Sequence, residues 1–173
     1  MAKNGLTLIY TGSGKGKTSA AFGLALRAAG HGLRVCIIQF IKGQWPTGET
    51  KAVSRFADLI ELHTKGAGFT WTSTEEETRQ AAAQAWQLAM EKALSDRYDL
   101  LILDELTYLV SYQLLAEEEV LDLLARRPAR LHLLITGRDA SPGLIAAADL
   151  VTEMKEIKHP FDTGVAAQKG IEF

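Results

Sequence analysis

Short apolar runs alternate along this chain with longer stretches in which apolar residues recur at helical spacing. A near-continuous apolar run bounded by glycine, proline or charged residues is typical of a strand buried on both faces of a parallel sheet. Strands are expected at residues 6–10, 34–40, 59–62, 98–105 and 131–136, with a last, more exposed one at 150–157. This alternation of strands and helices predicts a three-layer α/β domain with a mainly parallel sheet.

The stretches between these runs carry helix signals. The predicted helices cover residues 19–29, which end at Gly30, and then 49–57, 73–95, 106–125 with a break near 114–117, and 142–148. Ser73 and Glu76 have the spacing of a capping box, and Arg127-Pro128 ends the fourth helix. Residues 158–173 have no clear period, and we expect them to lie over the functional site or over a partner subunit.

A glycine-rich turn joins the first predicted strand to the first predicted helix. Its sequence is Thr11-Gly12-Ser13-Gly14-Lys15-Gly16-Lys17-Thr18. In such a turn the backbone N–H groups point inward and form a cradle for phosphates, to which the helix adds its positive end. Lys17 is then expected to contact the outer phosphates and the Thr18 hydroxyl to ligate Mg²⁺. We therefore predict a P-loop NTPase-like domain that binds a nucleoside triphosphate through Gly12 to Thr18.

The turn departs from the usual G-x-x-x-x-G-K-[ST] pattern at one position. Thr11 stands where the pattern has glycine, although Gly12 beside it can supply a positive φ. The alternative interpretation is a glycine- and lysine-rich turn that binds nothing. Lys15 and Lys17 would then point into an empty nest, which makes a poor structural turn, so we favour the phosphate site.

Charged residues also follow two later strands, at the sheet edge where open α/β proteins bind ligands. Asp104 and Glu105 end the fourth predicted strand, and such carboxylates hold the metal ion of a nucleotide site directly or through water. Either carboxylate could be the direct ligand. Arg138 follows the fifth strand and could reach triphosphate oxygens, the alternative being a salt bridge to Asp139 or another acid.

Two loops carry further candidates for ligand contact. Lys42, Trp45 and Glu49 lie in the loop after the second strand, where each is a possible ligand contact or a solvated loop residue. Phe69 and Trp71 lie on a glycine-flanked loop. These aromatic residues either pin the loop to the domain or form a flat apolar platform for a ring system.

Composition and charge narrow the function classes. The chain has 173 residues, 47% hydrophobic and 23% charged, with a formal net charge of −2, which fits one globular domain over residues 1–173. Without a basic excess, no nucleic-acid partner is expected. No apolar segment has membrane-spanning length and no signal-peptide pattern is present, so we expect a cytoplasmic protein without a membrane partner. The single Cys36 excludes an internal disulfide, and the spacing of the histidines suggests no zinc site.

The residues alone leave the reaction open. An ATPase or small-molecule kinase would move the γ-phosphate, and Glu105 could orient the attacking water. The absence of an obvious lid or substrate domain is unfavourable to a kinase. A carrier that binds its ligand without turnover is a further alternative.

Several sequence blocks point to a more specific reaction. They are residues 10–23, Gln39-Phe40-Ile41-Lys42-Gly43, Trp45-Pro46 with Gly48-Glu49, Gly68-Phe69-Thr70-Trp71, Leu103-Asp104-Glu105-Leu106-Thr107-Tyr108, Thr136-Gly137-Arg138, and Lys158-His159 with Phe161-Asp162 and Gly164. In this order they resemble the P-loop type of ATP:corrinoid adenosyltransferases, which make adenosylcobalamin. The blocks span nearly the whole chain, and the Phe-Thr-Trp and Leu-Asp-Glu-Leu-Thr-Tyr blocks are the most specific.

The resemblance implies transfer of the 5′-deoxyadenosyl group of ATP to cobalt(I) of a corrinoid, with release of triphosphate. It also implies a homodimer, an external electron donor such as a reduced flavoprotein, and a nucleotide bound in reverse so that the ribose C5′ is exposed. The family aromatics that match Phe69 and Trp71 close under the corrin and exclude the lower cobalt ligand, which eases reduction of cobalt(II). The implied catalytic residues are therefore Lys17, Phe69 and Trp71, with no general base because cobalt(I) is itself the nucleophile.

The chain departs from the family at its start. Family members carry an N-terminal helical extension that helps to cover the corrinoid, whereas here the first predicted strand begins at Leu6. Coverage of the corrinoid is therefore expected to be looser, or to come from another segment or subunit.

Overall fold

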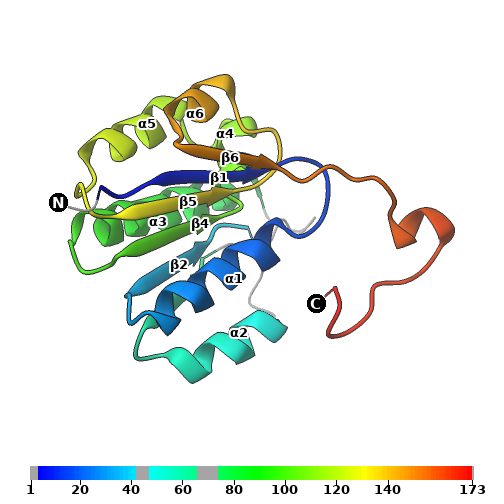
Figure 1. Ribbon diagram of the computed structural model, residues 1–173. Coiled ribbons are helices and arrows are strands. Elements are labelled where there is room, and N and C mark those ends of the chain that lie inside the picture. The colour runs from blue at the N-terminus through cyan, green and yellow to red at the C-terminus, as the bar shows by residue number, and fades with distance from the viewer. Residues whose placement is uncertain (1–3, 42–46, 66–73, 173) are drawn as a thin grey trace.

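The computed structural model describes residues 4–41, 47–65 and 74–172, which form a sheet between two helical layers (Figure 1). The strands are β1 (Thr7–Thr11), β2 (Val35–Gln39), β3 (Ile60–Thr64), β4 (Leu100–Asp104), β5 (His132–Thr136) and β6 (Leu150–Glu153). Their order is β3-β2-β4-β5-β1-β6, and every described pair is parallel. The carboxyl ends of all these strands therefore lie at one edge of the sheet.

Helices cover the two faces of the sheet unequally (Figure 1). On one face lie α1 (Lys17–Gly30) and α2 (Gly48–Val53), and on the other lie α3 (Glu75–Leu94), α4 (Leu106–Ser111), α5 (Glu117–Arg126) and α6 (Pro142–Ala147). Short 3₁₀ helices follow at Ser54–Phe56 and Pro160–Thr163. The three-layer α/β architecture with a parallel sheet is confirmed, as is the break in the helix predicted for residues 106–125.

The capping of α3 and the end of β6 differ from the prediction. The capping box of α3 is formed by Thr74 and Glu77, whose side chains each bond the other residue's backbone N–H. The predicted pairing was that of Glu76 with Ser73, which lies outside the described residues. Both pairs have the same spacing, and the sequence alone did not separate them. Strand β6 ends at Glu153 because its partner β1 turns away after Thr11, which leaves the predicted residues up to 157 without a neighbouring strand.

A polar cluster fastens the edge strand β3 to α3. Glu61 accepts hydrogen bonds from Lys92 Nζ at 2.8 Å and from the Tyr98 hydroxyl, and it lies 2.6 Å from His63 Nε2. Burial alone would raise the pKa of Glu61, but these hydrogen bonds outweigh it and hold the pKa at about 2. The cluster therefore favours the charged carboxylate in the folded protein.

Replacing Glu61 with glutamine should lower the free energy of unfolding at pH 7 by about 1 kcal/mol, a modest value for a partly exposed cluster. Because the folded-state pKa is depressed, this contribution is present above the unfolded value of about 4.3 and disappears as the pH falls toward 2. Urea unfolding at pH 7 and near pH 2.5 measures the difference in stability, which should be much smaller at the lower pH. The matched control is Glu91→Gln, at an exposed carboxylate on α3. Equal stabilities of the Glu61 variant and the wild type at pH 7 would contradict the prediction.

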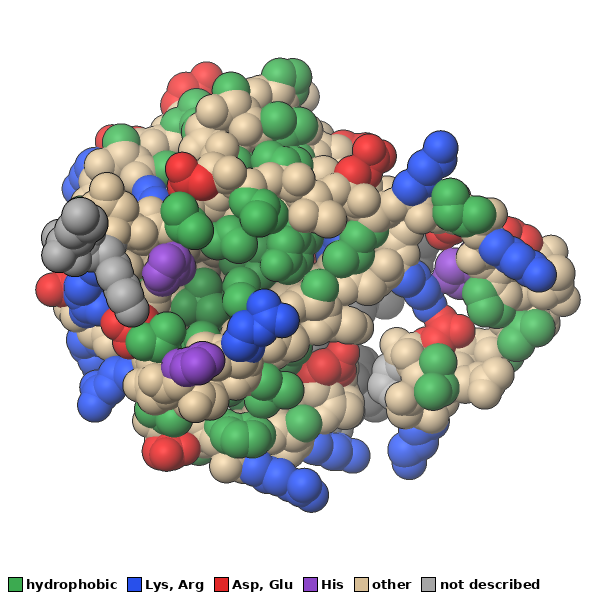
Figure 2. All heavy atoms as spheres, viewed as in Figure 1, with side chains coloured by type: hydrophobic (Ala, Val, Ile, Leu, Met, Phe, Trp, Pro, Cys, Tyr) green, Lys and Arg blue, Asp and Glu red, His purple; other side chains and the backbone are tan. Residues whose placement is uncertain are grey.

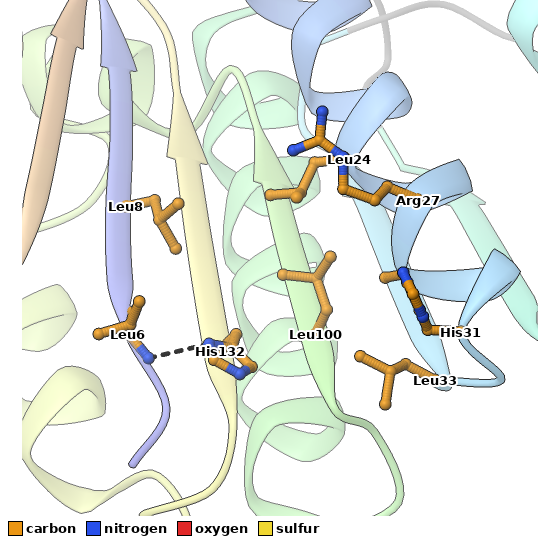
Figure 3. A pocket seen from close by; sticks show the side chains of 9 residues that line it. Leu6, Leu8, Leu24, Arg27, His31, Leu33, Leu100 and His132 are labelled. Atoms are coloured by element: carbon orange, nitrogen blue, oxygen red, sulfur yellow. Dashed lines mark hydrogen bonds between the residues drawn. The ribbon is translucent and has the colours of Figure 1, made fainter. Parts of the chain in front are cut away.

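An apolar groove of about 270 Å³ lies on the α1 side of the sheet. Figure 3 shows Leu6 and Leu8 facing Leu24 of α1 across Leu100, with the Leu6 N–H donating to His132 Nδ1 at 3.0 Å. Hydrophobic side chains also gather on this face in Figure 2. The groove lies toward the amino ends of the strands, away from the glycine-rich turn. Within the described ranges, no helix has the length and apolar character needed to span a membrane.

Candidate functional site

The glycine-rich turn runs from the end of β1 to the start of α1 and packs against the chain after β6. Gly12 and Gly16 have φ values of 101° and 106°, in the left-handed region that glycine adopts without strain. A Cβ atom at Gly12 or Gly14 would lie 2.5 or 2.7 Å from the Met154 carbonyl oxygen. Both positions therefore require glycine, and the expected positive φ at Gly12 is confirmed.

The threonine that replaces the first glycine of the motif has its own role. Thr11 is buried at the end of β1, and its Oγ1 accepts a hydrogen bond from the Ala140 N–H at 3.2 Å. This bond ties the turn to the loop after β5, where Arg138 lies. The Thr11 hydroxyl thus supplies a contact between the turn and the loop after β5 that glycine could not make.

Lys17 lies inside the turn at the start of α1. Its Nζ donates to the carbonyl oxygens of Gly12 at 2.6 Å and Gly14 at 2.7 Å. Burial, and after it the nearby charge of Arg138, lowers the pKa of Lys17. A negatively charged group bound beside Lys17 would offset both effects, so the site is electrostatically prepared for an anion.

A row of polar side chains crosses the carboxyl ends of the strands beneath the turn. Gln39 and Asp104 are register partners in β2 and β4, and Gln39 Nε2 donates to Asp104 Oδ2 at 3.0 Å. Asp104 Oδ1 accepts from the hydroxyls of Thr18 at 3.0 Å and Thr136 at 2.7 Å. Asp104 is fully buried, so these donors hold its charge in a fixed position.

This arrangement fits a magnesium ion on its donor chemistry. The Thr18 hydroxyl donates its hydrogen bond to Asp104, which leaves the lone pairs of the hydroxyl oxygen available to a cation. Glu105 lines the adjoining cavity as a second oxygen donor. Its backbone φ is 68°, a value that residues other than glycine rarely adopt, and its N–H donates to Thr136 Oγ1 at 2.9 Å. Hard oxygen ligands of this kind are those that Mg²⁺ prefers.

A cavity of about 490 Å³ opens above the turn. Its described lining comes from five places in the chain and comprises Gly14 to Ser19, Glu49, Glu105 with Tyr108, Thr136 to Arg138, and Ile171 with Glu172. The Lys15 ammonium forms an ion pair with Glu172 at its rim. Burial raises the pKa of the Tyr108 phenol, whose ring stacks on that of Tyr112. The cavity thus combines cations, an aromatic wall and acidic oxygens in one place.

Most of the predicted site residues meet in this region. The cavity is lined by seven of them, namely Gly14, Lys15, Gly16, Lys17, Thr18, Glu105 and Arg138. Of the others, Gly12 packs against Met154, Ser13 is exposed, and Asp104 is buried beneath the turn. Of the loop candidates, Glu49 lines the cavity, while Lys42 and Trp45 lie outside the described residues. Phe69 and Trp71 also lie outside the described residues, so their roles remain predictions.

The sequence alone indicated no role for Gln39, Thr136, Tyr108 or Glu172. For Gln39 and Thr136 the sequence did contain a sign of a functional position, because each is a polar residue at the end of a strongly apolar run. A buried polar side chain at such a position needs a hydrogen-bond partner, and the nearby carboxylate supplies it. For Glu172 there was no signal, since it lies in a stretch without periodicity.

Comparison with known proteins points to one family. The family described as ATP:corrinoid adenosyltransferase BtuR/CobO/CobP matches residues 3–173. A corrinoid adenosyltransferase of Pseudomonas aeruginosa is 43% identical over 172 residues, covering 99% of this chain and 85% of that protein. One from Escherichia coli K12 is 42% identical, covering 99% and 87%, and one from Sinorhizobium is 41% identical, covering 99% and 81%.

Among solved structures, the flagellar accessory protein FlaH of Methanocaldococcus jannaschii has a TM-score of 0.51 at 11% identity, covering 87% of this chain and 71% of that one. At that identity the likeness concerns the fold alone. The family match and the curated relatives are stronger evidence of relationship, because their sequences match this chain over nearly its whole length. The chain therefore belongs to the ATP:corrinoid adenosyltransferase family, as its sequence blocks predicted.

Proposed function

We propose that this chain transfers the 5′-deoxyadenosyl group of ATP to cobalt(I) of a corrinoid and releases triphosphate. The family match over residues 3–173 carries the proposal. The phosphate cradle and the 490 Å³ cavity beside it support it with a place for the nucleotide. We propose that residues 1–173 form a single domain, which would contain the nucleotide-binding part of the active site.

In the proposed reaction, the electron pair of cobalt(I) attacks the ribose C5′ carbon. The Co–C bond forms as the C5′–O bond breaks, and its electron pair leaves on triphosphate. Cobalt is formally oxidised to cobalt(III), so each turnover from cobalt(II) needs one electron from an external donor. We propose a reduced flavoprotein as that donor. No general base is required because no proton leaves the nucleophile.

The main task of the protein groups is then to stabilise the leaving triphosphate. Negative charge grows on the bridging oxygen as the C5′–O bond breaks, and fixed positive groups nearby lower the barrier. Lys17 and the backbone N–H groups of the turn are suited to this task, with Lys15 and Arg138 at the cavity rim. Mg²⁺, when bound through Thr18 and Glu105 or Asp104, would neutralise further phosphate charge.

Phe69 and Trp71 are proposed to face the corrin and to exclude the lower cobalt ligand. Replacing both with alanine should lower adenosylation from cobalt(II) with reductant by at least about tenfold, since removing two large aromatics opens the apolar wall to water. Binding of MgATP, measured by calorimetry, should remain unchanged. Full activity of the double variant would contradict the platform role. A loss of nucleotide binding would instead make the loop a structural part of the phosphate site.

We also propose a homodimer. The edge strand β6 is exposed along its length and carries the apolar side chains Leu150 and Val151, which pairing with a second copy would remove from water. Sedimentation velocity on the purified chain tests this, and a monomer at micromolar concentration would contradict it. Because the reaction needs ATP and a strong reductant, we place it in the cytoplasm.

The decisive experiment is an anaerobic assay with purified protein, Mg²⁺, ATP and chemically reduced cobalamin. Triphosphate that forms in step with loss of the cobalt(I) absorption bands would support adenosyl transfer. Orthophosphate with an unchanged corrinoid spectrum would overturn the proposal and assign the chain to the ATPases. Tight binding of both ligands with no phosphate product would make it a carrier.

A further inference from the structure

The segment of residues 154–172 leaves the sheet after β6 and returns to the cavity (Figure 1). At its start, the Gly14 N–H donates to the Met154 carbonyl oxygen at 2.7 Å, and the Met154 N–H donates to the Thr11 oxygen at 2.8 Å. Near its end, Ile171 and Glu172 line the cavity. The segment is thus held at the glycine-rich turn near both of its ends.

Between these ends the segment packs little against the domain. Ile157 and Phe161 are 84% and 77% exposed. The 3₁₀ helix at Pro160–Thr163 is closed by bonds from its own residues, such as the Thr163 hydroxyl to the Pro160 oxygen. Moving the far end of the segment would therefore break few contacts with the domain.

Near the far end, Glu172 forms an ion pair with Lys15. It brings a carboxylate into a cavity lined by Lys15, Lys17 and Arg138, a setting suited to phosphate oxygens. The Glu172 side chain is only 14% exposed, whereas Lys15 is 56% exposed. Beside a bound triphosphate, the Glu172 carboxylate would face several like charges at short range, which is unfavourable.

We infer that Glu172 and triphosphate compete for Lys15, and that triphosphate in the cavity displaces the end of segment 154–172. The inference rests on the proposed function, in which ATP brings the triphosphate and the product carries it away. Glu172 lowers the affinity for both, and its return to Lys15 assists the departure of triphosphate. Glu172 is therefore a positioning residue that acts through Lys15.

The test is calorimetric titration with inorganic triphosphate in the presence of Mg²⁺. Glu172→Gln should bind the probe about fivefold more tightly than the wild type, the scale expected for one partly exposed charge pair. Asp162→Asn, which removes an exposed carboxylate from the same segment, should bind as the wild type does. In a Lys15→Met background, Glu172→Gln should change the affinity little, because its partner is gone.

The outcomes separate this inference from the proposed function. Equal or weaker binding by Glu172→Gln in the presence of Lys15 would overturn the competition, even if the wild type adenosylates cobalamin normally. The same tightening in the Lys15→Met background would also overturn it, since Glu172 would then act without Lys15. A wild type that binds no triphosphate would also overturn the competition, whereas the proposed function is decided separately by the anaerobic assay.

Discussion

Replacing Lys17 with alanine is expected to lower kcat/KM for ATP by about 10³-fold, the upper end of what one charge-stabilising donor contributes to catalysis. Lys17 is half-buried, and its ammonium is held between the carbonyl oxygens of Gly12 and Gly14. Charge that develops on the leaving triphosphate would thus meet a cation that is already oriented and partly desolvated. The measurement is the anaerobic assay of cobalt(I) loss at several ATP concentrations.

Lys15→Ala is the matched control for this prediction. Lys15 belongs to the same turn, but it is largely exposed and its charge is screened by water, so a loss of about tenfold or less is expected. Thermal unfolding of both variants checks that the turn still folds. A Lys17 variant with wild-type turnover would refute the phosphate cradle, and equal losses in the two variants would mean that net charge, not position, decides the rate.

The strands of this fold could be read from the sequence because each is a buried apolar run. Leu100 to Leu103, for example, is apolar without alternation, and the structure buries it between α1 on one face and α3 on the other. The glycine-rich turn was equally readable, since its geometry depends on a few consecutive residues. Features of this kind are fixed by local sequence.

Features that depend on distant residues could not be read in this way. The sequence left the roles of Asp104 and Glu105 open. In the structure Asp104 ends β4 facing α1 and is fully buried, whereas Glu105 takes a left-handed conformation and lines the cavity. That difference depends on Thr18 and Thr136, which bond Asp104 from other elements.

The return of segment 154–172 is a similar case. Without a hydrophobic period, this stretch was expected to lie over the site or over a partner subunit, and the structure brings Ile171 and Glu172 into the cavity of the same chain. Its course depends on the backbone bonds of Met154 to the turn and on one ion pair. None of these contacts follows from local sequence preference.

Replacing Asp104 with asparagine should lower turnover by about 10²-fold and shift the dependence on Mg²⁺ to higher concentrations. The amide keeps the size of the carboxylate but removes the charge that the Thr18 and Thr136 hydroxyls and Gln39 Nε2 hold in place. Its NH₂ group must also face one of these donors, which should cost about 1–3 kcal/mol in the free energy of unfolding. Turnover measured against Mg²⁺ concentration, with urea unfolding alongside, separates the two effects.

Two further variants separate the effect of the Asp104 charge from that of its hydrogen bonds and from that of Glu105. Thr136→Val keeps the charge of Asp104 but removes two hydrogen bonds, the one that Thr136 donates to Asp104 and the one that it accepts from the Glu105 N–H. It should therefore lower stability by about 1–3 kcal/mol, with a smaller effect on the Mg²⁺ requirement than loss of the charge has. Glu105→Gln removes the acidic oxygen that lines the cavity. If it raises the Mg²⁺ requirement more than Asp104→Asn does, Glu105 is the direct ligand and Asp104 acts through Thr18. Should neither variant alter the Mg²⁺ dependence, the strand-end carboxylates do not hold the metal, and charge on the triphosphate must be met by Lys17 and the backbone of the turn.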